Sequence, residues 1–381
     1  EGKKSQYYNN ALLRLGLLTY NQGDINGALA YYKRVMSNEP NPKERGEAML
    51  GIEEIYIKDL GQADNYLAYV DSIPGFELTE FSRDSLNYTI AKNFYLNADY
   101  KKAISSFSDY LTRFPKGFYR TDAFYYRADC YNLNKDYGLA VKDYEKIIEQ
   151  GTSAYLERSL IKAAIIAYNY SQNFSDALNY YKKYEALIAD ETEKYNAQLG
   201  ALRSAFRIGV DKDVYDYGQK VINSKLASAE EKASAYYYLG KTHYKNNDTE
   251  QAIAAFEKVA SMSNNSQAAE SRYLIAEAYF KAGQYKSAEN QCNITNEASG
   301  NYPFWVAKSI ILLSDIYVKR NDLLNARAAL EAVIENFKDD EGIINTANAK
   351  LKQLEGIEAE QSRVKPAASN LLEMQNLNGG N

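Results

Sequence analysis

Few residues of this chain could do chemistry by themselves, and they are widely spaced. The only histidine, His243, has no nearby pattern of cysteine, histidine or carboxylate residues, so it cannot supply the three or four ligands of a zinc site. The two cysteines, Cys130 and Cys292, are single and far apart, which excludes a disulfide framework and a paired-cysteine redox or zinc motif. We therefore expect neither a metal nor a cofactor.

Sequence motifs of enzymes are also lacking. The chain has no nucleophile elbow, phosphate-binding loop, zinc-protease motif or dinucleotide fingerprint. The acidic runs at Glu53-Glu54 and at residues 339–341 are interpreted as solvated helix or turn residues. Because no nucleophile, base and orienting group can be assembled, we expect a protein that is not an enzyme.

Charge and hydropathy exclude two further classes. The net charge is −5, and the basic residues are interspersed with acidic ones, so no footprint for nucleic acid is present. No apolar run reaches the roughly 18 residues that span a bilayer, so we expect no direct membrane insertion. The sequence starts at Glu1 without a signal-like segment, and we expect any targeting signal or anchor to lie upstream.

The densest cluster of polar aromatic residues is the stretch YYYLGKTHY at 236–244, and it belongs to a repeated frame. A small residue is followed twelve residues later by alanine and four residues after that by a large apolar side chain, as in Gly240, Ala252 and Phe256. Equivalents of Ala252 occur at positions 28, 63, 103, 140, 177, 214, 252, 288 and 326. Their separations of 35 to 40 residues predict nine helical hairpins, each covering the apolar face of its neighbour.

This frame resembles the tetratricopeptide repeat family, which alternates small and large residues along a helix-turn-helix unit. The matching residues in the first, third and eighth repeats are Leu12, Leu15, Gly16, Gly23, Ala28, Tyr32, Val35 and Pro40; Phe94, Ala103, Phe107 and Pro115; and Tyr279, Gly283 and Ala288. The resemblance covers about residues 9–340 and implies an all-α, right-handed superhelix of about nine hairpins. The spacing is longer than the family's, most closing prolines are missing, and the repeat around Val214 is weak.

The predicted organisation has three parts. Residues 1–340 form the repeat solenoid, and residues 341–360 form a C-terminal capping helix. Residues 361–381 form a polar tail that we expect to be disordered, with docking of its apolar residues on the solenoid as the alternative. In the predicted cap, one face carries the apolar residues Ile343, Ala347, Leu351 and Leu354.

The family register divides the first helix of each repeat into a face that packs on its partner helix and a face that lines a concave groove. In the stretch quoted above, it places Tyr236, Leu239 and His243 inward. The residues that it places in the groove, and that we expect to bind a partner, are Tyr88, Lys92, Tyr95, Tyr125, Asp129, Arg203, Phe206, Tyr237, Lys241, Tyr244, Tyr273, Glu277 and Phe280. Such a wall suits an extended peptide or a partner helix.

An alternative for each of these tyrosines is packing against the first helix of the next repeat, in a chain that holds 36 tyrosines. One binding mode of the family is not expected. Chaperone-binding members hold a C-terminal carboxylate with a lysine and an asparagine one turn later, whereas Lys162 at the lysine position is followed by Ile166.

We therefore expect a non-catalytic scaffold that holds a protein or peptide partner. The longer spacing and the abundance of Tyr, Asn and Lys resemble cell-envelope tetratricopeptide proteins of Gram-negative bacteria, of the Tol-Pal coordinator and outer-membrane assembly lipoprotein types. That resemblance implies a periplasmic or outer-membrane-associated location, with the cytoplasm as the alternative. Two other hypotheses stay open: a regulatory sensor module gated by a small peptide or glycan, and self-association through the weak repeat or the tail.

Overall fold

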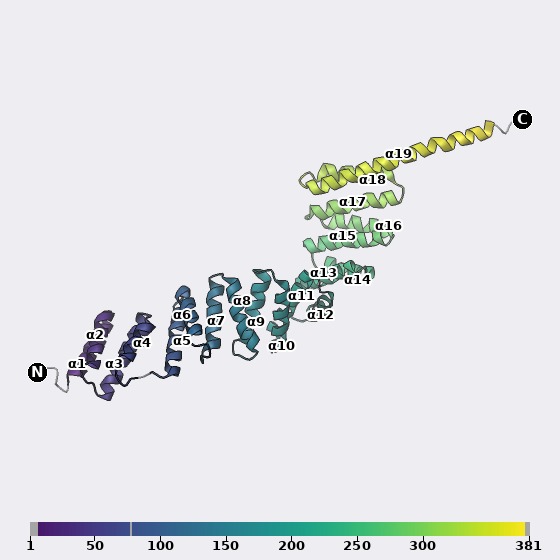
Figure 1. Cartoon of the computed structure of the whole chain (residues 1–381). Coiled ribbons are helices and arrows are strands. Elements are labelled where there is room, and N and C mark those ends of the chain that lie inside the picture. Colours follow the sequence, from purple (N-terminus) through teal and green to yellow (C-terminus); the bar gives the residue numbers. More distant parts are fainter. Residues whose placement is uncertain (1–6, 77, 378–381) are drawn as a thin grey trace. The chain divides into compact units, whose positions relative to one another are not determined.

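The computed structural model describes residues 7–76 and 78–377, and for residue 63 and residues 362–377 it describes the backbone alone. All regular elements of this described part are helices, and they form two compact units, Glu1–Leu187 and Ile188–Asn381 (Figure 1). The predicted all-α helical-repeat fold is confirmed.

The first unit is a stack of five helical hairpins within its described residues. In the second hairpin, α3 continues into a short π-helix, η2, before the turn. The helices of this unit are α1 (Tyr8–Asn21), α2 (Ile25–Met36), α3 (Pro42–Glu54), η2 (Ile55–Asp59), α4 (Ala63–Asp71), α5 (Glu80–Leu96), α6 (Tyr100–Arg113), α7 (Arg120–Leu133), α8 (Tyr137–Gln150), α9 (Leu156–Asn169) and α10 (Phe174–Leu187).

The second unit contains four hairpins and a long final helix. Its helices are α11 (Glu191–Ile208), α12 (Asp211–Asn223), α13 (Ala229–Lys245), α14 (Thr249–Met262), α15 (Ser266–Lys281), α16 (Tyr285–Ala298), α17 (Pro303–Lys319), α18 (Leu323–Asn336) and α19 (Glu341–Leu377). The weak repeat around Val214 is therefore a complete hairpin, α11–α12.

Each of the nine described hairpins turns at one residue in the left-handed backbone region. These residues are Gly23, Gly61, Ala98, Lys135, Gln172, Gly209, Asn247, Gly283 and Asn321. In several hairpins an aspartate follows and caps the second helix: Asp24 accepts a hydrogen bond from the Gly27 amide at 2.9 Å, and Asp322 accepts one from the Asn325 amide at 3.2 Å. The turn thus reverses the chain and starts the next helix within a few residues.

The seam inside each hairpin is built from small residues. Eight of the nine marker positions have described side chains, and each of these is at most 1% exposed: Ala28, Ala103, Ala140, Ala177, Val214, Ala252, Ala288 and Ala326. At the start of the stack, a Cβ on Gly16 or on Gly51 would lie within 2.7 Å of the Tyr32 ring, so that ring fills the space between α1 and α3. Small residues on one helix therefore make room for an aromatic ring from another.

The final helix covers the last hairpin. Ile343, Ala347 and Leu354 of α19 are at most 6% exposed and pack in one cluster with residues of α17 and α18, and Leu351 is partly buried there. The helix is continuous from Glu341 to Leu377, so the predicted cap and most of the predicted tail share one element. The division at residue 360 stays a prediction, and residues 378–381 lie outside the described part.

Candidate functional site

Two matching sets of contacts join successive first helices, one set in each unit. In the first unit, the Tyr88 hydroxyl of α5 donates to Asp122 of α7 at 3.5 Å, and the Tyr95 hydroxyl donates to Asp129 at 3.1 Å. In the second, the Tyr237 hydroxyl of α13 donates to Glu270 of α15 at 2.8 Å, and the Tyr244 hydroxyl donates to Glu277. The same spacing thus produces the same tyrosine–carboxylate contacts in both units.

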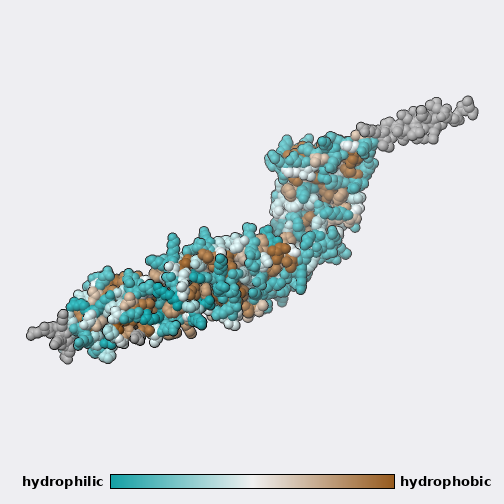
Figure 2. All heavy atoms as spheres, in the orientation of Figure 1, coloured by the Kyte–Doolittle hydropathy of each residue, from teal (hydrophilic) through white to brown (hydrophobic). Residues whose placement is uncertain are grey.

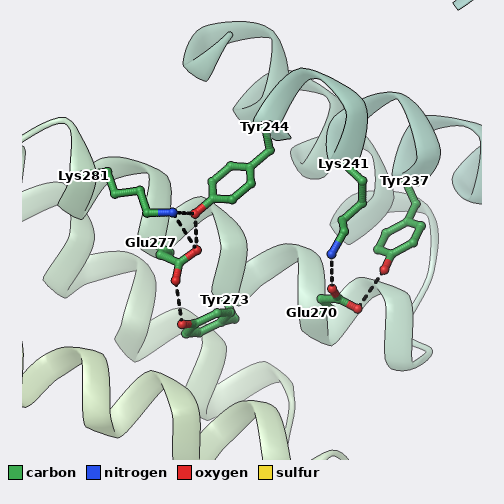
Figure 3. A network of polar contacts seen from close by, with 7 residues as sticks. All are labelled: Tyr237, Lys241, Tyr244, Glu270, Tyr273, Glu277 and Lys281. Atoms are coloured by element: carbon green, nitrogen blue, oxygen red, sulfur yellow. Dashed lines mark hydrogen bonds and ion pairs between the residues drawn. The ribbon is translucent and has the colours of Figure 1, made fainter. Parts of the chain in front are cut away.

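The predicted groove residues of α13 and α15 lie together in this network (Figure 3). Glu270 accepts from both Tyr237 and the Lys241 ammonium, the latter at 2.7 Å. Glu277 accepts from Tyr273 at 3.0 Å as well as from Tyr244. Phe280, the remaining predicted residue of these two helices, is not among the residues drawn, and its ring centroid lies 5.7 Å from that of Tyr285.

Several predicted groove tyrosines are buried rings. Exposed fractions are 5% for Tyr88, 6% for Tyr125, 9% for Tyr237 and 7% for Tyr273. Tyr88 stacks on Tyr119 with ring centroids 4.4 Å apart, and Tyr125 stacks on Tyr155 at 4.3 Å. Their positions agree with the alternative of packing between repeats, so most of each ring is unavailable to a partner. Their role in partner binding stays a prediction.

The expected division within the α13 stretch does not separate buried rings from exposed ones. Tyr236, expected inward, is half-buried, whereas Tyr237, expected in the groove, is the more buried ring. The reason is that α15 packs over the Tyr237 side of α13 and supplies Glu270 to its hydroxyl. His243 lies beside the Tyr215 ring, with centroids 4.9 Å apart, and its Nδ1 lies 3.3 Å from Asp248, which fits a packing role.

The remaining predicted residues lie in the first unit and in α11. Asp129 is 8% exposed and accepts from Tyr95, Tyr144 and Lys162. The Lys92 ammonium lies over the Tyr88 and Tyr126 rings. In α11, the ring centroid of Phe206 lies 4.4 Å from that of Tyr238, and Arg203 is exposed.

A pocket of about 500 Å³ opens beside the α15 end of the network, within the second unit. Three predicted residues, Tyr273, Glu277 and Phe280, contribute to its wall. The rest of the lining comes from Lys281, from α17 and from the segment at the start of α19: Phe304, Lys308, Ile311, Leu312, Asp315, Asp340, Gly342, Ile343, Thr346 and Lys350. Hydrophobic side chains with a few charged groups are the usual lining of a binding pocket.

Hydrogen bonds fix the acidic groups of this pocket. Burial raises the pKa of Glu277, but the Tyr244 and Tyr273 hydroxyls and the Lys281 ammonium lower it by more, so its net pKa lies below the ordinary value. Lys350 of α19 donates to both carboxylate oxygens of Asp315, at 2.7 and 2.9 Å. The Asp340 carboxylate accepts from the Ile343 amide at 3.0 Å. Each carboxylate of the wall thus has a donor.

Lys308 is the residue that the sequence did not single out. Its ammonium lies 4.7 Å from the Tyr273 ring centroid and 5.3 Å from that of Trp305. A signal for it existed: Lys308 stands at the register position where the first helices α7 and α15 carry the carboxylates of Asp122 and Glu270. Phe304, 46% exposed at the mouth of the pocket, was also missed, because the start of a helix lies outside the periodic frame.

No group of three or more His, Cys, Asp or Glu side chains among the described residues is placed to hold a metal ion. Within the same residues, every helix is too short or too polar for a bilayer-spanning segment. On the face seen in Figure 2, hydrophilic residues predominate, with hydrophobic residues between them.

Tetratricopeptide repeat models match residues 10–42 and 88–155, and the model of the anaphase-promoting complex (cyclosome) subunit 3 matches residues 215–295. No curated protein sequence matches the chain significantly.

Solved structures similar to this chain include the C-terminal part of a TPR repeat-containing protein from Cytophaga hutchinsonii, at 18% identity over 68% of this chain and 98% of that one, with a TM-score of 0.46. A tetratricopeptide repeat protein from Parabacteroides merdae is 19% identical over 71% and 96% of the two chains, with a TM-score of 0.28. YrrB, a TPR protein with an unusual peptide-binding site, is 18% identical over 54% and 97%, with a TM-score of 0.40.

The two tetratricopeptide models fall on α1–α2 and on α5–α8, and the anaphase-promoting complex model falls on α12–α16. The seam residues and hairpin turns found under these models recur in the other described hairpins. The chain belongs to the tetratricopeptide repeat superfamily.

Proposed function

We propose that this protein is a scaffold that holds a segment of a partner protein against the first helices of its second unit, with the pocket beside α15, α17 and α19 as the anchor point. Tetratricopeptide repeats suggest a protein–protein interaction scaffold, and members of the superfamily bind protein or peptide partners and are typically non-catalytic. The observation that carries the proposal is the pocket itself, in which apolar walls and oriented charges converge.

The tyrosine–carboxylate contacts support this role by holding the pocket wall in place. Tyr273 and Glu277 form part of the wall, and their mutual hydrogen bond is joined to α13 through Tyr244. A side chain held by hydrogen bonds and buried neighbours loses little freedom when a partner binds, which favours affinity. The predicted residues therefore act partly through positioning.

We further propose that the scaffold works in the cell envelope of a Gram-negative bacterium, in the periplasm or at the outer membrane. The support is the compositional and spacing resemblance given above, with the cytoplasm as the alternative. Fractionation of source cells that express the tagged full-length gene product checks this proposal. Recovery in the cytoplasmic fraction alone would refute it.

The binding proposal is tested by selecting displayed random peptides on the immobilised chain and measuring their affinity by fluorescence anisotropy. Phe304→Ala removes an exposed ring from the pocket mouth, and we expect it to weaken binding by roughly tenfold, as for an interface anchor. The matched control is Ile294→Ala in α16, since Ile294 is 48% exposed and does not line the pocket. Equal affinities for both variants and the wild type would place the binding site elsewhere.

A further inference from the structure

Lys308 occupies a place in the pocket where its charge has no opposite partner among the residues that the structure describes. Lys308 as a residue is half-buried, and its ammonium lies over three aromatic rings, 4.7 Å from the centroid of Tyr273, 5.3 Å from that of Trp305 and 5.7 Å from that of Phe304. Within the described part of the chain, no carboxylate lies within salt-bridge distance of it. Ring faces attract a cation, but less strongly than a hydrogen-bonded carboxylate does.

The other two lysines of the pocket have acidic partners. Lys281 lies 3.5 Å from Glu277, Lys350 holds Asp315, and Asp340 accepts a hydrogen bond from the start of α19. A ligand that enters the pocket therefore meets apolar walls and one cation that is free to form an ion pair. A ligand carboxylate that pairs with Lys308 would therefore not have to displace a carboxylate of the protein.

The charge at the register position of Lys308 is opposite to the charge in two earlier first helices. In α7 and α15, the register position of Lys308 carries Asp122 and Glu270, and each accepts a hydrogen bond from a tyrosine of the preceding first helix. In α17, the lysine instead places its ammonium over the ring of the corresponding tyrosine, Tyr273, whose hydroxyl donates to Glu277. The carboxylate that accepts the tyrosine hydroxyl in α7 and α15 therefore has no counterpart at this position of α17.

We propose that the partner segment supplies that carboxylate. The pocket binds an internal Asp or Glu side chain beside a large apolar residue: Lys308 pairs with the carboxylate, and the apolar neighbour packs against Phe280, Phe304 and Ile311. We assign the carboxylate to an internal acidic residue of the partner and not to its C-terminus. The reason is that the pocket offers one cation without an acidic partner and no second group of donors that would hold a terminal carboxylate. This inference rests on the proposed function and specifies the partner's chemistry at the same site.

The test uses short random peptides, acetylated and amidated at their ends, in pools that differ by one fixed central residue. We expect pools with central Asp or Glu to bind the wild-type chain about tenfold more tightly than pools with Asn or Gln. Lys308→Met keeps the apolar stem over the rings and should abolish this preference, whereas Lys308→Arg should retain it. Lys286→Met in α16 is the control, since the Lys286 side chain is 75% exposed and outside the pocket.

The outcomes separate this inference from the proposed function. Peptide binding without a preference for acidic residues would overturn the inference and leave the scaffold proposal standing, as would a preference that survives in Lys308→Met. A parallel set of the same pools is made with free C-termini, and tight binding by that set alone would overturn the assignment to an internal acidic residue. If no pool binds at all, both proposals fall. Thermal melting of each variant identifies any loss of affinity that follows from unfolding.

Discussion

A Cβ atom placed on Gly240 would lie 2.7 Å from Cδ1 of Phe256, closer than real Cβ contacts allow. Gly240 belongs to the first helix of a hairpin and Phe256 to the second, and the Phe256 side chain is fully buried. The two helices therefore pack with the ring directly against the glycine backbone. Gly16 and Tyr32 repeat this relationship in the first hairpin.

The substitution Gly240→Val should lower the free energy of unfolding by about 1–3 kcal/mol, because the added atoms force the buried ring and the helix backbone apart. Urea unfolding followed by circular dichroism measures the change. Gly356→Val in α19 is the matched control, since no atom lies within 4 Å of a Cβ there, and its effect should stay within about 0.5 kcal/mol. Equal losses at both positions would show that the seam is looser than described.

The substitution Tyr237→Phe should cost about 0.5–1.5 kcal/mol, because it removes one donor from Glu270 while leaving Lys241 in place. A double-mutant cycle with Glu270→Gln measures the coupling directly. Tyr236→Phe serves as the control, because Tyr236 is half-buried on the same helix and no hydrogen bond of its hydroxyl is found within the described residues. Additive effects of Tyr237→Phe and Glu270→Gln would contradict an energetic contact between successive first helices.

Stability should fall with acid partly through Glu277. The carboxylate has a lowered pKa in the folded chain, so its ionised form favours folding above the unfolded pKa, and this contribution is lost as the pH falls through the folded pKa. Glu277→Gln should therefore destabilise the chain by about 1 kcal/mol near pH 7 and by less near pH 3. The exposed Glu257→Gln is the control. A gap that is constant or that widens in acid would reverse the assigned sign.

Both thiols should be inert in the folded chain. Burial raises the pKa of Cys130 to about 12, with Asp129 adding to the shift, and burial raises the pKa of Cys292 to about 12 as well. Both side chains are fully buried. A thiol-specific chromogenic reagent near pH 8 should react at least about a hundredfold more slowly with the native chain than with the chain in urea. In Cys130→Ser only Cys292 can react, and in Cys292→Ser only Cys130 can react. Fast labelling of either native variant would contradict the prediction and show that the helix packing around the remaining thiol opens.

The repeated pattern of small and large residues that defines the hairpins can be read from the sequence, because its residues lie close together along the chain. Ala28 and Ala252 each fall near the start of a second helix, where any larger side chain would meet the first helix. The hairpin turns are less visible. Gly23 marks one, since glycine tolerates the left-handed backbone, but Ala98 and Lys135 adopt the same backbone at equivalent turns and carry no such signal.

Three of the predicted partner-binding residues also belong to the lining of the pocket. Tyr273, Glu277 and Phe280 line a pocket, but the register could not show that Tyr237 is more buried than Tyr236, with its hydroxyl donating to Glu270 of α15. That difference depends on how far one hairpin rotates on the next, and a repeat pattern averages over the rotation. The sequence does not single out Lys308, because its lack of an acidic partner depends on the tertiary structure, which places its ammonium over the Tyr273 and Trp305 rings.

By itself, the sequence determined the repeat family, the hairpin period, the small-residue seams and the apolar face of the final helix, because each depends on residues close together along one or two helices. Only the tertiary structure decided which tyrosines are buried, which carboxylates receive their hydroxyls and where a cation is left unmatched. Those features arise between hairpins, from residues about one repeat apart, where the packing angle decides which side chains meet.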